Sequence, residues 1–141
     1  MTTGFTVTVY SFSYRSSPPP FGGEHGGGFV FDCRCVPNPG REERFKSQHG
    51  RDPEVIAWLE GRPEATSFFS SAASLIEQAV SVYRARGFSH LMVSFGCTGG
   101  QHRSVYFAER LSRHLREKFG VAAPVHHLQL PKILAGEPQT A

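Results

Sequence analysis

A run of eight residues, from Cys97 to Ser104, brings together glycines and polar side chains that could hold a phosphate group. The run follows an apolar stretch and precedes a helical pattern, so its glycines let backbone N–H groups converge beside a helix N-terminus. Thr98 and Ser104 carry hydroxyl donors, Arg103 a planar guanidinium fork, and His102 an imidazole. The alternative is a tight turn whose glycines serve packing alone. The predicted ligand contacts are Cys97, Thr98, Gly99, Gly100, Gln101, His102, Arg103 and Ser104.

The same residues satisfy a second pattern, Cys-x-x-Gly-x-x-Arg-Ser, which resembles the phosphate-binding loop of the cysteine-dependent phosphatases. In those enzymes the cysteine is a thiolate nucleophile, and the helix N-terminus and the arginine lower its pKa. Cys97 and Arg103 would take these roles here, with Asp32 or Asp52 as the general acid. Gly96 stands where those enzymes usually have a histidine, and free cysteine is most often a small buried residue. We therefore expect binding in preference to catalysis.

Length and composition limit the class of protein. The chain has 141 residues, 39% of them hydrophobic and 19% charged, which predicts one globular domain. A net charge of +3 fits a phosphate-bearing partner, either a small anion or a nucleic acid, and fits an ordinary basic surface equally well. No apolar run approaches the roughly 20 residues that span a bilayer. Three cysteines and the lack of a signal peptide favour the cytoplasm.

The rest of the sequence predicts the elements that must position the turn. β-branched and aromatic residues indicate strands at 5–12, 29–36, 90–95 and 125–130. Helical spacing of apolar residues indicates a short helix from Pro53, and longer ones at 63–86 and 101–119. This order predicts a single-domain α/β fold with a small, largely parallel four-stranded sheet flanked by helices. Residues 15–28 are predicted to form a Gly- and Pro-rich loop, and 131–141 a frayed tail.

The other two cysteines, Cys33 and Cys35, are two apart on a predicted strand, so they should share a face and be poorly placed to bridge each other. A Cys-x-Cys metal site completed by His25, His126 or His127 is a less favoured alternative. We expect neither a metal nor a cofactor.

Three segments carry a wider resemblance: GCTGGQHRSVYFAERLSRHL, FVFDCRCVPNPG and VTVYSFSY. Together they resemble the C-terminal domain of the RapZ family of RNase adapter proteins, over residues 5 to about 130. The resemblance implies binding of glucosamine 6-phosphate and of small regulatory RNAs. It implies that Thr98, Gly99, Gly100, His102 and Arg103 hold the phosphate, and that residues 31–34 and 37–39 wall the pocket. Asp32, Arg34 and Asn38 therefore join the predicted ligand site.

The sequence departs from the family pattern at several places. Full-length members carry a nucleotide-binding P-loop domain with no counterpart here, so we expect a standalone domain. Arg15-Ser16-Ser17 replaces the usual Lys-His-Gly, and His25 could substitute from the glycine-rich segment 21–28, which we expect to act as a lid. The closing His-Arg-Glu becomes His127-Leu128-Gln129, and beyond Pro131 only Lys132 is basic.

The basic residues divide into two groups. Those on the last long helix are explained by i,i+4 ion pairs at least as well as by RNA contacts; they are Arg110, Arg113, Arg116 and Lys118. A loop near the predicted pocket offers the candidate RNA contacts Arg41, Arg44, Lys46 and Arg51.

The function that we predict is a non-catalytic sensor or adapter domain that binds an amino-sugar phosphate such as glucosamine 6-phosphate. RNA, a protein partner and a second copy of the chain are further candidate partners. Two alternatives stay open. One is a cysteine-dependent phosphatase, or another phosphoryl-group enzyme, using Cys97 and Arg103 with Asp32. The other is an RNA-binding protein without a metabolite ligand.

Overall fold

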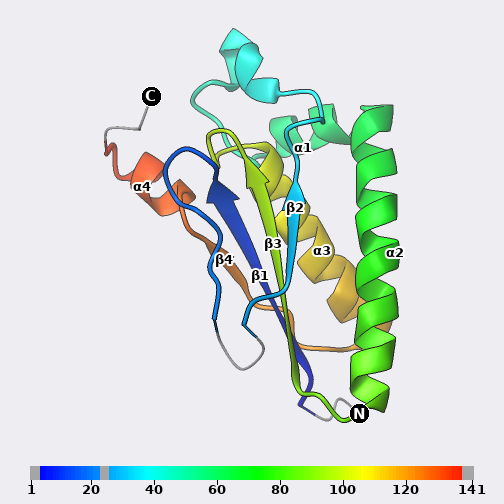
Figure 1. Ribbon diagram of the computed structural model, residues 1–141. Coiled ribbons are helices and arrows are strands. Elements are labelled where there is room, and N and C mark those ends of the chain that lie inside the picture. Colours follow the sequence, from blue (N-terminus) through cyan, green and yellow to red (C-terminus); the bar gives the residue numbers. More distant parts are fainter. Residues whose placement is uncertain (1–3, 23–25, 138–141) are drawn as a thin grey trace.

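The computed structural model describes residues 4–22 and 26–137, and within them the chain forms a four-stranded sheet backed by helices (Figure 1). All strand pairs are parallel, and the strand order is β2-β3-β1-β4. The strands are β1 (Thr6–Ser13), β2 (Phe29–Asp32), β3 (His90–Cys97) and β4 (Val125–His127). The helices are α1 (Pro53–Glu60), α2 (Pro63–Ala85), α3 (Arg103–Phe119) and α4 (Leu130–Leu134), with 3-10 turns at Pro39–Arg41 and Glu43–Phe45.

The long central strands give the sheet its register. β1 pairs with β3 over eight residues, from Thr6 opposite His90 to Ser13 opposite Cys97. Alternation along β1 sends Val7 and Val9 into the core, whereas Thr6 and Thr8 are only half-buried. The carboxyl ends of β1 and β3 therefore finish side by side, at the edge where β3 leads into α3.

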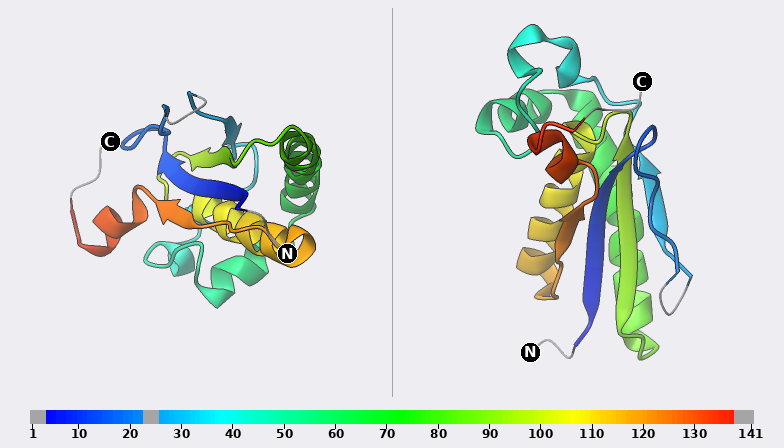
Figure 2. Two further views of the ribbon diagram at one scale, coloured as in Figure 1. Left: turned by 90° about the horizontal axis from the view of Figure 1, so that it is seen from below. Right: turned by 90° about the vertical axis from the view of Figure 1, so that its left-hand side faces the viewer.

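The helices α2 and α3 pack on one face of the sheet (Figures 1 and 2). An aromatic cluster joins them to it: the ring of Phe31 on β2 stacks on Phe95 of β3 and meets Phe68 of α2 edge-on. Phe107 of α3 contacts both Phe95 and Phe68. This cluster fixes where α3 begins relative to the end of β3, and so it positions the turn between them.

The predicted single-domain α/β fold is confirmed, and the sheet is parallel throughout. Most predicted boundaries lie within two residues of the structure, but three were wrong by more than that. The second strand ends at Asp32, four residues early, because the Asp32 carboxylate accepts a hydrogen bond from the Arg34 N–H and turns the chain. The last strand ends at His127. Residues 131–134, expected to be frayed, lie in α4, with Pro131 in its first turn.

Cys33 and Cys35 were expected to share a face of the strand. Because the chain turns after Asp32, they do not: Cys33 is buried, whereas Cys35 is exposed. Among the described residues, no group of three His, Cys, Asp or Glu side chains is placed to hold a metal ion. No helix in residues 4–22 or 26–137 is long and apolar enough to cross a membrane.

Candidate anion-binding site

The turn between β3 and α3 depends on two neighbouring glycines with different roles. Gly100 has a φ of +67°, in the left-handed region that favours glycine, and its Cα packs against Ser13 and Gln129. Gly99 has open space where a side chain would be. Within the described part of the chain, the backbone N–H groups of residues 99–102 donate to no acceptor. Four successive free N–H groups beside the positive end of a 17-residue helix suit an anion.

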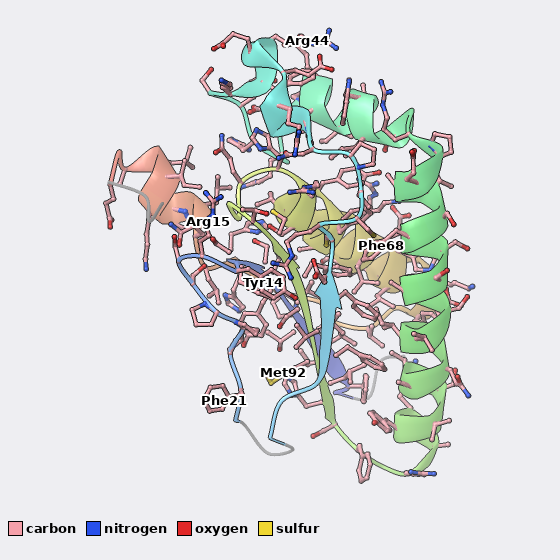
Figure 3. The ribbon with its side chains drawn as sticks, turned by 45° about the horizontal axis from the view of Figure 1, so that its top comes forward. Tyr14, Arg15, Phe21, Arg44, Phe68 and Met92 are labelled. Atoms are coloured by element: carbon pink, nitrogen blue, oxygen red, sulfur yellow. The ribbon has the colours of Figure 1, made fainter. Side chains whose placement is uncertain are left out.

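One side of the turn is fastened to the end of β1 by Ser13. The Ser13 hydroxyl donates to the Thr98 carbonyl at 2.7 Å and accepts from the N–H groups of Arg15 and Ser16 at 3.2 and 3.1 Å. The N–H of Tyr14 donates to the Cys97 carbonyl at 3.0 Å. These bonds hold Arg15 next to the turn (Figure 3).

The opposite side is fastened to the segment 45–50 by two residues that were expected to contact a ligand. The Gln101 side-chain amide donates to the carbonyls of Lys46 and Gln48 at 2.9 and 2.7 Å. The His102 Nε2 donates to the Phe45 carbonyl at 2.8 Å. Burial lowers the pKa of His102, so its ring is neutral at neutral pH. Both side chains thus hold Lys46 beside the turn.

Arg103 joins the turn to the segment after β2. Its side chain is almost fully buried, with 5% exposed, and Nη1 donates to the carbonyls of Arg34 and Val36 at 3.0 and 2.9 Å. Its Nε is buried without a partner among the described residues. Part of the guanidinium fork that was expected to bind a ligand is therefore used in holding the protein together.

Two adjoining cavities open at this edge of the sheet and share Asn38, Thr98 and Arg103. We call the first the Arg15 cavity. It has a volume of about 390 Å³ and is lined by residues 97–99 and 101–103 together with Arg15, Asn38, Gly40 and Lys46. The second, the Arg41 cavity, has a volume of about 320 Å³; besides the shared residues it is lined by Arg34, Cys35, Val36, Pro37 and Arg41.

The described linings of both cavities contain cations but no carboxylate. Arg15 and Arg41 form no ion pair with any described residue. Lys46 pairs with the exposed Glu43 at 3.5 Å. Arg34 is occupied by two-pronged hydrogen bonds to Asp32 and lies over the Tyr14 ring at 3.9 Å. The site is therefore strongly electropositive.

The geometry around Cys97 bears on the phosphatase alternative. The thiol is 2% exposed, donates to the Ser104 hydroxyl at 3.2 Å and accepts from the Ser104 N–H at 3.4 Å. The hydrogen bonds from Arg34 hold the pKa of Asp32 below its usual value, so at neutral pH this carboxylate has no proton to donate. Neither Asp32 nor Asp52 lines the Arg15 cavity or the Arg41 cavity. The thiol is therefore buried and hydrogen-bonded to Ser104, and neither predicted general acid is placed beside it.

The predicted site residues divide by where they lie. Most line one of the cavities: Cys97, Thr98, Gly99, Gln101, His102, Arg103, Arg34 and Asn38. Gly100 and Ser104 are buried beneath the turn, and Asp32 is exposed beside it. His25 lies outside the described residues. The described glycines of the predicted lid, 26–28, line a different cavity with His90, at the amino end of β3.

The candidate RNA contacts divide as well. Arg41 and Lys46 line the cavities. Arg44 lies over the Phe45 ring, at the outer end of the 3-10 turn Glu43–Phe45 (Figure 3). Arg51 pairs with Glu109 at 3.7 Å. Arg15, Gly40 and Ser13 were missed as parts of the site. A basic residue directly after the first strand was the available signal for Arg15.

Comparison with known proteins places these residues in a family. Nucleotide-binding proteins from Thioalkalivibrio sulfidiphilus, Halorhodospira halophila and Dinoroseobacter shibae are 44%, 42% and 41% identical to this chain over 114, 115 and 126 residues. The alignments cover 78%, 82% and 89% of this chain but 40%, 38% and 40% of the relatives. The chain thus spans about two fifths of the length of these relatives. The profile of the RapZ C-terminal domain matches residues 5–131, and the chain belongs to that family.

Proposed function

We propose that this chain is a non-catalytic sensor or adapter domain that holds a phosphorylated small molecule, an amino-sugar phosphate such as glucosamine 6-phosphate, in the Arg15 cavity. One observation carries the proposal: the free N–H groups of residues 99–102 stand among Arg15, Lys46 and Arg103, with no carboxylate in the described lining. Family membership supports it, since relatives are named nucleotide-binding proteins and nucleotides carry phosphate.

The chemistry of each group suits a phosphate ester. The helix N-terminus and the free N–H groups offer hydrogen bonds to oxygens at fixed positions. Thr98 adds a hydroxyl, and Arg15 adds a charged fork that no carboxylate of the described residues competes for. Gly99 adds no side chain to the lining and leaves open space beside it. The cavity volume of about 390 Å³ is within the range for small-molecule sites.

Isothermal titration calorimetry tests the proposal with glucosamine 6-phosphate, inorganic phosphate and glucosamine. We expect the first two to bind and glucosamine to bind far more weakly, because the phosphate group carries the recognition. Arg15→Gln should weaken phosphate binding by about fivefold to tenfold, from loss of one charge-assisted hydrogen bond. Arg44→Gln is the matched control, since Arg44 lies outside both cavities, and should change little. Absence of binding by both phosphates, or equal losses in the two variants, would contradict the proposal.

RNA binding is the second candidate, because Arg41 and Lys46 are exposed beside cavities suited to a backbone phosphate. Contacts of this kind give an affinity that falls steeply as salt is added. A gel-shift assay over a salt series decides it. We expect a complex that forms at low salt and dissociates as salt rises, and no shift at low salt would leave only the small-molecule role.

A further inference from the structure

The two cavities at the carboxyl edge of the sheet share part of their walls. Three residues, Asn38, Thr98 and Arg103, belong to the walls of both. The Asn38 side chain accepts from the Gly40 N–H at 2.9 Å, and its carbonyl accepts from the Arg41 N–H at 3.2 Å. The turn that carries Arg41 is therefore fixed to the residue that both cavities share.

The 3-10 turn Pro39–Arg41 also packs tightly on the turn between β3 and α3. A side chain on Gly40 would meet the His102 ring at 3.2 Å, so glycine permits this approach. His102 is itself tied to the Phe45 carbonyl. The Arg41 cavity is thus held beside the Arg15 cavity by buried contacts and not by exposed side chains alone.

The cations are distributed between the cavities in a way that one phosphate does not explain. Each cavity has its own arginine without a carboxylate partner among the described residues, Arg15 in one and Arg41 in the other, and both are lined by Arg103. A phosphate monoester carries a charge between about −1.5 and −2 at neutral pH. Three guanidinium groups without carboxylate partners in two adjoining cavities match a ligand with a second anionic group next to the first.

We propose that the physiological ligand is a phosphorylated small molecule with two linked phosphates, as in a diphosphate ester, and that one phosphate lies in each cavity. A monophosphate such as glucosamine 6-phosphate would then fill the Arg15 cavity alone. This inference rests on the proposed function, since it requires that the Arg15 cavity bind phosphate. It goes further by assigning Arg41 to the second phosphate. Because Thr98 and Asn38 border both cavities, they lie where the bridge between the two phosphates would be.

Calorimetry with inorganic phosphate and pyrophosphate, at one ionic strength, tests this inference. Pyrophosphate should bind the wild type about tenfold or more tightly than phosphate, through the added charge-assisted contacts. Arg41→Gln should weaken pyrophosphate binding by about fivefold and leave phosphate binding within about twofold. Arg15→Gln should weaken both, and Arg44→Gln neither.

The outcomes separate the two proposals. If phosphate binds, but pyrophosphate binds no more tightly or Arg41→Gln affects both ligands equally, the two-phosphate inference is overturned and the proposed function stands. If neither anion binds, the two-phosphate inference is overturned, and if glucosamine 6-phosphate also fails to bind, the proposed function is overturned with it. Near-identical circular dichroism spectra and unfolding midpoints of the three exposed-arginine variants would confirm that each one folds.

Discussion

Alanine at two adjacent glycines of the turn should have very different effects on stability. At Gly100 the φ of +67° strains any residue with a side chain, at a cost of about 1–2 kcal/mol. The added Cβ would also lie 2.8 Å from the Gln129 Cβ and 3.0 Å from the Ser13 Cβ. Overpacking of this kind costs about 1–3 kcal/mol. Gly100→Ala should therefore lower the free energy of unfolding by about 2–5 kcal/mol.

Gly99→Ala is the matched control, one residue away in the same turn. Its φ lies outside the left-handed region, and the added Cβ would have no atom within 4 Å. Because alanine also restricts the unfolded chain, the free energy of unfolding should stay the same or rise by up to about 1 kcal/mol.

Urea titrations measure the free energy of unfolding of both variants. The signal is the fluorescence of Trp58, the single tryptophan, which packs edge-on against Phe45. Equal slopes against urea would show that the difference lies in stability and not in the unfolded state. A Gly100→Ala variant within about 1 kcal/mol of wild type would refute the described turn. So would a Gly99→Ala variant as unstable as Gly100→Ala.

Three further predictions use other contacts of the site. Arg103→Met should lower the free energy of unfolding by about 2–4 kcal/mol in urea titrations, because two carbonyls lose their charged donor. It should also weaken phosphate binding. Unchanged stability would show that the hydrogen bonds from Arg103 are unimportant for folding. Burial lowers the pKa of His102, so the unfolded chain takes up a proton that the folded chain does not. Stability should then be complete above about pH 6.5 and fall as the pH drops below it, and His102→Gln should flatten part of that fall. Cys97→Ser and wild type should both leave p-nitrophenyl phosphate unhydrolysed, and turnover by wild type that the serine variant lacks would make this protein an enzyme.

Much of the fold could be predicted because its signals are local. A run rich in β-branched and aromatic residues indicated β1, and the apolar run of β3 indicated a central strand. Boundaries were harder, because they depend on single contacts: the Asp32 carboxylate ends β2 by capping a turn. The helix α4 has only five residues, too few to show a helical repeat.

The turn after β3 could also be located from the sequence, but the hydrogen-bond partners of its side chains could not. The sequence shows that Gln101 and His102 carry donors; it does not show that these donors point to carbonyls more than 50 residues away. Arg15 belongs to the site because β1 and β3 end side by side in parallel register. That neighbourhood follows from the strand order, which a pattern of elements does not specify.

The proposed function depends on an anion that binds at the turn between β3 and α3. A titration of ¹⁵N-labelled protein with inorganic phosphate, followed through its backbone amide resonances at constant ionic strength, tests it most directly. We expect saturable shifts that are largest for the free N–H groups of residues 99–102. Anion binding at this turn would be contradicted if these four amide resonances did not shift and the shifts appeared instead around the cavity formed by residues 26–28 and His90.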